Sequence, residues 1–474
     1  MNRKLEEFKK TIKTKKVAVL GIGVSNIPLI NYLSDLGVDI TAFDKSSKEI
    51  LGSTAEEFLN KGVALSLGEN YLDKLKGFDV VFRTPGIRFD IPELTAEKER
   101  GAEITSEMEV FFELCPAEIF AVTGSDGKTT TTTLIYNILK QEGYSCWLGG
   151  NIGTPLLSRI DEIKETDKVV LELSSFQLHT MRKSPEHALI TNITPNHLDV
   201  HKSLEEYIDA KKNIFIHQKD EKGFGTPRLV LNLDNEITKG LAREAKGKVV
   251  FFSRKQQLME GAFLKDGVLV YKKDNIETEI VKADDIVIPG MHNIENYLAA
   301  TAMTMNFVKP ETIHKVAGTF KGVEHRIELV REINGVRFYN SSIDSSPSRT
   351  AAALSTFKQK VILIAGGKDK GIPYDEIGEP IAQKVKCLVL IGATAPKIEQ
   401  ALKDTIEKTG KGKDIPVFKC STYEEAVKTA YENAKPGDIV ILSPASTSFD
   451  MFKNFEERGR VFKDIVNSLA TLEC

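Results

Sequence analysis

A glycine-rich turn between an apolar strand and a helix constrains the fold of this chain more than any other feature. The apolar run 119–122 precedes the turn, and a helical pattern follows it, with apolar residues at 134, 135, 138 and 139 on one side. The turn contains Gly124, Ser125, Asp126, Gly127, Lys128, Thr129 and Thr130. Backbone N–H groups in such a turn can surround phosphate oxygens, and the helix N-terminus favours anions. The segment therefore predicts a parallel α/β layer with a nucleotide site.

Two residues of this turn carry the expected chemistry. Lys128 is placed to reach the terminal phosphates of a nucleotide, and the Thr129 hydroxyl is placed to ligate Mg²⁺. The loop is shorter than the common GxxxxGK[ST] form, so a glycine-rich turn with a solvated lysine is the competing interpretation. The strand, the glycines, the Lys-Thr pair and the helix agree with one another, which favours a phosphate loop.

Apolar strands alternate with helical stretches along almost the whole chain, which is typical of α/β proteins. With 474 residues and roughly 150 residues per domain, the length predicts about three domains. The pattern places them at 1–106, 107–321 and 322–474. We expect Rossmann-like first and third domains around a central ATPase-like domain. Its sheet should be mostly parallel, with β-hairpins at 254–288.

Composition and charge argue against several other classes of protein. The chain has 67 acidic and 64 basic residues and a formal charge of −3, which gives no general reason to bind nucleic acid or an anionic membrane. The N-terminus is charged, and no apolar run approaches the roughly 18 residues of a membrane helix. The five cysteines are scattered without a CxxC pair, as in a reducing compartment. We therefore expect a cytoplasmic protein that neither binds nucleic acid nor inserts into a membrane. We also expect a monomer, although composition and charge do not indicate the oligomeric state.

Polar residues follow two further predicted strands, at the edge where doubly wound α/β folds place their sites. Glu172 ends the apolar run 169–171 and fits the acid that holds the metal of an ATPase. His197 and Asp199 follow the next strand, where a second metal or a phosphate could bind. Taken singly, an exposed strand-end glutamate and a structural histidine are the ordinary interpretations.

A second glycine pair lies near the N-terminus. Gly21 and Gly23 follow a strand, and Asp44 comes about twenty residues later, as in dinucleotide-binding folds. Asn26 replaces the third glycine of that motif, so the sequence supports NAD binding only weakly. A nucleotide or a uridine diphosphate could use the same turn, and a tight turn without a ligand is equally compatible.

Taken together, these segments resemble the Mur ligases of peptidoglycan synthesis, and within that family the D-glutamate-adding members. The resemblance covers the whole chain. It rests on GIGVS at 21–25, TPGI at 84–87, the phosphate loop at 123–130, GGNIGTP at 149–155, ELSSFQL at 172–178, NHLD at 196–199, GMHNIEN at 290–296, EHR at 324–326, GGKDKG at 366–371 and SPASTSFDMFKNFEERG at 443–459. The last motif is the most discriminating. The Asp-Asn-Pro-Arg motif of the diaminopimelate- or lysine-adding ligase is absent.

The resemblance implies an ATP-dependent amide ligase that adds D-glutamate to UDP-N-acetylmuramoyl-L-alanine through an acyl phosphate. A carboxylate is a poor electrophile, and phosphoryl transfer gives it a leaving group. The clustered anionic oxygens require Mg²⁺ and cationic side chains. By resemblance, Lys128 is the phosphate-loop lysine. Thr129 and Glu172 would then bind a first Mg²⁺, and His197 would bind a second.

Lys211 aligns with the family's carbamylated lysine. An ordinary ammonium would repel Mg²⁺, whereas a carbamate is an anion that can ligate it. The adjacent Lys212 is the alternative position, and a solvated helix residue is the ordinary interpretation of either lysine. The implied catalytic residues are therefore Lys128, His197 and Lys211.

The resemblance also implies which residues contact the substrates. The ATP contacts are residues 124–130 of the loop, Asn293 and Arg326. The contacts to the UDP-linked substrate are Val24, Ser25, Asp44, Lys45, Gly86, Asn151 and Ser174. The contacts to glutamate are Lys370, Ser448, Phe455 and Ser345. For Phe455, packing in the core is an equally supported interpretation.

One segment departs from the family's pattern. Many members read Asn-Asp-Ser-Lys-Ala-Thr after the strand at 336–339, whereas this chain reads NSSIDSSP at 340–347. A carboxylate and an ammonium are thus missing at Ser341 and Ile343. This change bears on nucleotide affinity and on the glutamate contacts, and Asp344 is a candidate replacement for the missing carboxylate.

Three other functions share parts of the pattern. A sister ligase, such as folylpolyglutamate synthase or the L-alanine-adding Mur ligase, would have the same phosphate loop, but the motif at 443–459 argues against it. A nucleotide-binding regulator without catalysis would explain the change at 340–347, but the implied catalytic and metal-binding residues are intact. A dinucleotide-dependent oxidoreductase would leave the phosphate loop unexplained.

Overall fold

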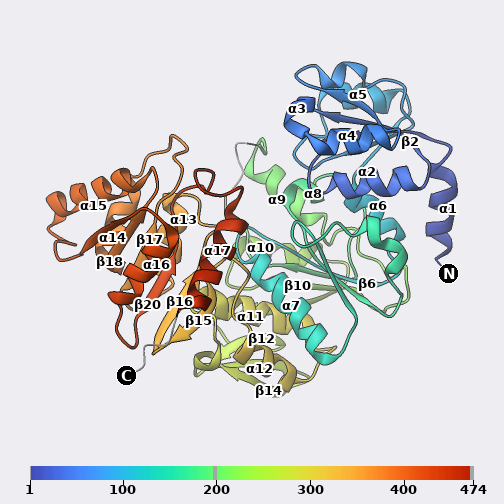
Figure 1. Ribbon diagram of the computed structural model, residues 1–474. Helices are drawn as coiled ribbons and strands as arrows, with labels where there is room; N and C mark the ends of the chain where they lie inside the picture. The colour runs from blue at the N-terminus through green and yellow to red at the C-terminus, as the bar shows by residue number, and fades with distance from the viewer. Residues whose placement is uncertain (1, 196–199, 470–474) are drawn as a thin grey trace. The chain divides into compact units, whose positions relative to one another are not determined.

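The computed structural model describes residues 2–195 and 200–469, and these contain three β-sheets that follow one another along the chain (Figure 1). Each sheet is mostly parallel and is flanked by helices, which confirms the predicted α/β class with three domains. The chain divides into two compact units, Met1–Lys282 with Glu295–Val316 and Ala283–Ile294 with Ala317–Cys474. None of the helices in the described ranges is long and apolar enough to cross a membrane.

The N-terminal sheet has five parallel strands in the order β3-β2-β1-β4-β5. The strands are β1 (Lys16–Leu20), β2 (Asp39–Asp44), β3 (Ala64–Leu67), β4 (Val80–Arg83) and β5 (Glu103–Thr105). The helices are α1 (Arg3–Ile12), α2 (Asn26–Asp35), α3 (Lys48–Leu51), α4 (Ser53–Asn60) and α5 (Pro92–Glu99). The last four residues of the central strand β1 are buried, as its apolar sequence predicts. The turn after β1 lies at the switch between β2 and β4, where ligands bind in such sheets.

The central sheet has nine strands in the order β14-β13-β12-β11-β10-β9-β6-β8-β7. The strands are β6 (Glu118–Thr123), β7 (Cys146–Gly150), β8 (Lys168–Glu172), β9 (His187–Ile190), β10 (Arg228–Asn232), β11 (Lys248–Ser253), β12 (Gly261–Lys265), β13 (Val268–Lys273) and β14 (Ile276–Lys282). The helices are α6 (Glu107–Leu114), α7 (Lys128–Glu142), α8 (Ser175–Leu178), α9 (Leu204–Lys212), α10 (Glu236–Leu241), α11 (Met291–Thr304) and α12 (Pro310–Thr319). The fully buried β6 lies between β8 and β9 and runs parallel to both. The segments that follow these three strands therefore emerge at one edge of the sheet.

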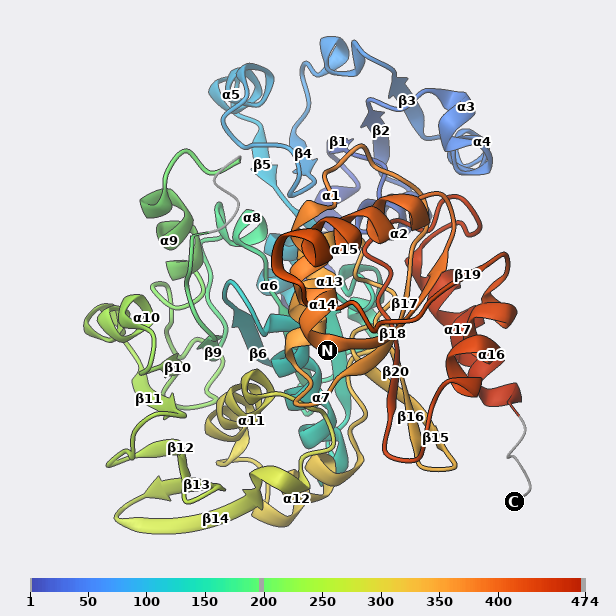
Figure 2. The same cartoon turned by 90° about the vertical axis from the view of Figure 1, so that its left-hand side faces the viewer.

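The hairpins predicted at 254–288 are confirmed. Strands β12, β13 and β14 pair antiparallel at one end of the central sheet, and Figure 2 shows them following β11 outward. The sequence pattern does not single out β7, β10 or β11, because their apolar runs are only three or four residues long and such short runs occur in buried strands and buried helices alike.

The C-terminal sheet has six strands in the order β15-β16-β20-β17-β18-β19, and β15 runs antiparallel to β16. The strands are β15 (Glu328–Ile333), β16 (Val336–Asn340), β17 (Val361–Ala365), β18 (Val385–Ile391), β19 (Val417–Cys420) and β20 (Ile439–Leu442). The helices are α13 (Pro347–Ser355), α14 (Gly378–Lys384), α15 (Ala395–Thr409), α16 (Tyr423–Glu432) and α17 (Phe455–Ser468). Two separate apolar clusters cover the two faces of this sheet: α13, α14 and α15 contribute to one, and α16 and α17 to the other.

Candidate active site

The phosphate loop joins β6 to α7, and its backbone requires glycine at two positions. Gly124 has a φ of +148°, and a Cβ added there would lie 1.9 Å from Thr191 Oγ1. Gly127 is the N-cap residue of α7 and has a left-handed φ of +77°. The loop therefore ends at a helix N-terminus, where backbone N–H groups and the helix dipole favour an anion.

The residues that follow β9 hold the loop from one side. Thr191 Oγ1 donates to the Asp126 carbonyl at 2.6 Å. The Asp126 N–H donates to Asn192 Oδ1 at 3.0 Å, and the Ser125 N–H donates to the Asn192 carbonyl at 2.9 Å. The Ser125 hydroxyl also lies 3.0 Å from the hydroxyl of Tyr207 on α9. The sequence does not reveal these supports, because they join segments that are about 65 residues apart.

Two lysines of the predicted site meet at one backbone carbonyl. Lys128 Nζ donates to the carbonyls of Gly124 (3.0 Å) and Ser125 (2.9 Å). Lys211 Nζ donates to the same Gly124 carbonyl at 2.8 Å and to Thr123 Oγ1 at 3.3 Å. The structure therefore brings Lys211 of α9 to the base of the phosphate loop, beside Lys128.

The surroundings of Lys211 differ from those of its neighbour Lys212. Lys211 is only 1% exposed, and burial together with the Lys128 ammonium holds its pKa well below the usual range. Lys212 Nζ instead pairs with Glu244 at 2.9 Å and with Asp209 at 3.3 Å, and the Glu244 hydrogen bond raises its pKa. Of the two candidate lysines, Lys211 faces the phosphate loop.

Glu172, the last residue of β8, carries a carboxylate oxygen suited to a metal ion. Its Oε1 accepts a hydrogen bond from Asn151 Nδ2 at 2.9 Å. Its Oε2 is buried and has no hydrogen-bond partner among the described residues. A buried carboxylate oxygen without a partner is costly unless a cation meets it. Because Mg²⁺ prefers carboxylate and hydroxyl oxygens, the residues present fit this ion.

Two other predicted residues lie at or near this edge of the sheet, and a third lies outside the described residues. Thr129 belongs to the first turn of α7, directly after Lys128. Ser174 is the N-cap residue of α8, and its hydroxyl accepts the Gln177 N–H at 3.2 Å. His197 lies outside the described residues, so its place beside the loop stays a prediction.

The turn after β1 is stabilised by the residue that replaces the third glycine. Asn26 Nδ2 donates to the carbonyls of Leu20 (3.0 Å) and Gly21 (2.9 Å). Asp44 Oδ2 accepts the Ile22 N–H at 2.7 Å. Five of the predicted contacts to the UDP-linked substrate lie in this turn or at or after the ends of β2 and β4. The exposed ones are Val24, Lys45 and Gly86, and the half-buried ones are Ser25 and Asp44.

The predicted glutamate contacts come from separate loops of the C-terminal domain. Lys370 Nζ lies 3.5 Å from Ser345 Oγ, so these two residues are neighbours. Ser448 is buried in the loop that follows β20. Phe455 begins α17, and its half-buried ring contacts the His325 ring edge to face, with 6.1 Å between centroids.

The segment that departs from the family's pattern carries a buried carboxylate. Asp344 accepts a hydrogen bond from Ser443 Oγ at 2.8 Å. Burial raises the pKa of Asp344 to about 6. The hydrogen bonds from Ser341 and Ser443, followed by the Arg326 charge, oppose this rise. Ser341 is fully buried, and its hydroxyl accepts the Ile327 N–H at 3.2 Å. Asp344 thus supplies a negative charge near Arg326, whereas Ser341 is part of the local packing.

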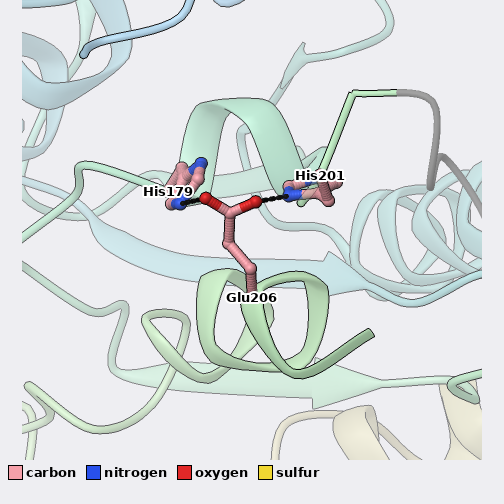
Figure 3. A group of neighbouring side chains, drawn as sticks. All are labelled: His179, His201 and Glu206. Carbon is pink, nitrogen blue, oxygen red and sulfur yellow. Dashed lines mark ion pairs between the residues drawn. The ribbon is translucent and has the colours of Figure 1, made fainter. Parts of the chain in front are cut away.

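One group of polar side chains was not identified from the sequence. His179 follows α8, His201 precedes α9, and Glu206 lies on α9, and both histidine rings turn a nitrogen toward the Glu206 carboxylate (Figure 3). Arg88 also contacts Glu206, with 3.0 Å between Nη2 and Oε1. No local motif signals this group, because His179 comes from a different segment than His201 and Glu206.

Models of three protein domains match consecutive parts of the chain. The MurD-like N-terminal domain of Mur ligases matches 15–106, the Mur ligase middle domain matches 122–304, and the Mur ligase glutamate ligase domain matches 325–446. Solved structures share the fold. The UDP-N-acetylmuramate-alanine ligase of Thermotoga maritima has a TM-score of 0.57 at 20% identity, covering 96% of this chain and 99% of that one. A D-alanyl-D-alanyl-adding ligase of Acinetobacter baumannii has a TM-score of 0.55 at 15% identity, covering 84% of this chain and 92% of that one.

Two curated relatives are similar over their full length. The UDP-N-acetylmuramoylalanine–D-glutamate ligase of Acetivibrio thermocellus is 69% identical over 99% of this chain and 100% of its own. The enzyme of the same name from Ruminiclostridium cellulolyticum is 64% identical over the same shares. The chain therefore belongs to the Mur ligase family, among the UDP-N-acetylmuramoylalanine–D-glutamate ligases.

Proposed function

We propose that this protein is an ATP-dependent ligase that joins D-glutamate to UDP-N-acetylmuramoyl-L-alanine in peptidoglycan precursor synthesis. The observation that carries the proposal is 69% identity to a ligase of that name along the whole chain. In this reaction ATP phosphorylates the substrate carboxylate, the amino group of glutamate attacks the acyl phosphate, and the tetrahedral intermediate collapses to an amide and phosphate. ADP, phosphate and the extended UDP-linked peptide leave the enzyme.

The phosphate loop is the part of the site that would hold the transferred phosphoryl group. The N-terminus of α7 would bind the phosphates of ATP through backbone N–H groups. Lys128, whose ammonium now binds two carbonyls of the loop, would turn to the terminal phosphates when ATP is present. Fixed positive groups of this kind stabilise the charge that develops during phosphoryl transfer.

The residues that would hold Mg²⁺ are the Thr129 hydroxyl, the Glu172 carboxylate and a carbamate on Lys211, with His197 at a second ion. When bound, Mg²⁺ supplies positive charge that neutralises the phosphate oxygens. The partnerless Oε2 of Glu172 supports the first of these sites. Asn151 fixes the same carboxylate through its other oxygen.

The burial of Lys211 supports the carbamate. Because burial and the Lys128 ammonium lower the pKa of Lys211, its side chain exists as the neutral amine more often than an ordinary lysine does. The amine nitrogen can attack CO₂, forming an N–C bond and releasing one proton, which gives an anionic carbamate. The carbamate would replace a repulsion between Lys211 and Lys128 with an attraction. It would also provide the oxygen ligands that an ammonium lacks.

Removal of CO₂ tests this assignment. Enzyme kept in CO₂-free buffer should lose activity, and added bicarbonate should restore it. A Lys211→Arg variant should be inactive with or without bicarbonate, because a guanidinium does not form the carbamate. A Lys212→Arg variant is the matched control and should respond to bicarbonate as the wild type does. Activity of Lys211→Arg near the wild-type level would contradict the proposal.

The remaining site assignments follow the family's pattern. The UDP-linked substrate would contact the turns after β1, β2 and β4, and glutamate would contact the neighbouring pair Lys370 and Ser345 together with Ser448 and Phe455. Asn293 and Arg326 would contact the nucleotide. We also propose the domain boundaries 106/107 and 321/322, a monomeric enzyme and a cytoplasmic location.

Phosphate release from ATP is the measurement that tests the function. The enzyme is supplied with Mg²⁺, ATP and UDP-N-acetylmuramoyl-L-alanine, and D-glutamate, L-glutamate, D-aspartate and no amino acid are compared. Release that requires D-glutamate, with a matching peptide product, is expected. Phosphate release with L-glutamate alone would support the proposed mechanism but show that the enzyme is specific for L-glutamate rather than D-glutamate. ATP binding without release under any condition would favour the non-catalytic regulator.

A further inference from the structure

We propose that His179, His201 and Glu206 form a binding site for Zn²⁺ or a chemically similar dication, distinct from the Mg²⁺ site. Their donor atoms all lie within 4.8 Å of one another. His179 Nε2 is 3.5 Å from Glu206 Oε1, and His201 Nδ1 is 3.8 Å from Glu206 Oε2. Two ligands that bind zinc tetrahedrally at about 2.1 Å lie about 3.4 Å from each other. Small side-chain rotations would therefore close the group around an ion.

The donor set selects the kind of metal. Two imidazole nitrogens and one carboxylate, with an open fourth position, are a known zinc coordination pattern. Imidazole suits Zn²⁺, Cu²⁺ and Ni²⁺, whereas Mg²⁺ prefers oxygen ligands and holds its water tightly. Zinc should therefore bind here even when Mg²⁺ is present in excess.

The second nitrogen of His201 supports its role as a ligand. His201 Nε2 lies 2.9 Å from Ser175 Oγ. If Nε2 carries the proton and donates to this hydroxyl, the lone pair of Nδ1 is directed to Glu206. Metal-binding histidines commonly fix their tautomer by donating the other N–H in this way. The ring is further held by Phe176, which stacks on it at 5.2 Å with 5° between the planes.

The Glu206 carboxylate is bound by the Lys202 N–H at Oε2 (2.5 Å) and by Arg88 at Oε1, and Arg88 is the cation that a metal ion would have to displace. It lies in the loop after β4 and bonds Glu206 through Nη2 at 3.0 Å. It also binds Asp90 through two hydrogen bonds, Nε–Oδ1 at 2.8 Å and Nη2–Oδ2 at 3.0 Å. A guanidinium displaced from Glu206 would thus keep a carboxylate partner. The ion and Arg88 therefore compete for the Glu206 carboxylate. A bound ion would remove the contact between the loop after β4 and α9 through Glu206, whereas the contacts of Arg88 with the Val200 carbonyl (2.6 Å) and of Asp90 with Lys202 (2.8 Å) would remain.

The competition for Glu206 bears on the catalytic site because α9 also carries Lys211. Glu206 and Lys211 lie on the same nine-residue helix. A cavity of about 560 Å³ borders the group and is lined by His179, Glu206, Asp209 and Lys212 among others. It gives an ion a route from solvent and leaves room for a water at the fourth position. A bound ion would therefore change the contacts of a helix that supplies the catalytic site.

Zinc binding by the full-length protein tests the proposal. The protein is first stripped with a chelator, and zinc is then titrated against a chromophoric chelator in excess Mg²⁺, which occupies the catalytic metal site. One zinc ion per chain is expected. Loss of an outer partner of a metal ligand costs about 10- to 100-fold in affinity. His179→Gln and Glu206→Gln should each weaken zinc binding at least that much, whereas His314→Gln, on α12, should not.

The Arg88→Gln variant is expected to change the zinc affinity in the opposite direction. Because it removes the competing cation, it should tighten zinc binding, which a variant that merely damages the fold would not do. Far-ultraviolet circular dichroism of each variant confirms that it is folded. No zinc retained in Mg²⁺, equal zinc affinity of His179→Gln and the wild type, or weaker binding by Arg88→Gln would each overturn the proposal.

Discussion

Glu107, at the start of α6, is buried and accepts the Leu157 N–H at 2.9 Å. Burial raises the pKa of its carboxyl from 4.5 to about 7, and backbone hydrogen bonds from Leu157 and Leu156 offset only part of this rise. The native state therefore holds a proton that the unfolded state releases. The stability from this group is complete below pH 4.5 and is lost as the pH rises through 7. The difference between the two pKa values corresponds to about 3 kcal/mol.

A Glu107→Gln variant should reveal this contribution. The amide keeps an acceptor for the Leu157 N–H but does not ionise. The melting temperature of the variant, relative to that of the wild type, is therefore expected to increase between the two pKa values. Thermal unfolding at a series of pH values measures it. Glu113→Gln, at an exposed position of the same helix, is the control. A difference for Glu107→Gln that does not change with pH would contradict the assignment.

At the scale of elements, a glycine of positive φ lies in the loop before α7 and another ends the helix. Gly124 lies in the loop before the helix, and a Cβ there would collide with Thr191 Oγ1 at 1.9 Å. Gly143 is the C-cap residue, with a φ of +114° and no atom within 4 Å of an added Cβ. Alanine at position 143 therefore introduces backbone strain alone, whereas alanine at position 124 also damages the phosphate loop.

Alanine at these two positions should have different effects. Gly143→Ala is expected to lower stability by about 1 kcal/mol through strain alone and to leave ATP binding unchanged. Gly124→Ala should also displace Thr191 and the loop, and weaken ATP binding by more than about tenfold. Calorimetric titration with ATP and thermal unfolding measure the two quantities. Equal ATP affinities for both variants would show that the loop tolerates the added methyl group.

At the scale of the whole molecule, the chain passes between its two compact units three times, at 282/283, 294/295 and 316/317. An acyl phosphate must be shielded from water until the amine attacks it. Ligases that hold substrates on several domains commonly achieve this by closing. We therefore expect a smaller radius of gyration in solution scattering when a non-hydrolysable ATP analogue and UDP-N-acetylmuramoyl-L-alanine are both present. The analogue alone is the control, and an unchanged radius with both ligands would argue against closure.

The local elements of the site could be predicted from the sequence. The strand at 119–122, the loop with Gly124 and Gly127 and the helix after it are present as expected. The strand that ends at Glu172 is also present. These predictions succeed because apolar periodicity, glycine backbone requirements and helix N-termini are properties of adjacent residues. The motifs also sufficed to identify the family, which the full-length relatives confirm.

Other features depended on contacts between distant segments. Lys211 and Lys212 have the same side chain, and only the packing of α9 on β6 buries Lys211 beside Lys128 and lowers its pKa. In the sequence, Asp344 does not stand out from its polar neighbours. Only the fold shows that Asp344 is buried near Arg326. His179 meets His201 and Glu206 from a different segment of the chain. The sequence by itself determined the local elements around the phosphate loop and the chemistry that their residues carry. The tertiary structure decided which charges lose water and which side chains meet, because burial and proximity are set by residues far apart along the chain.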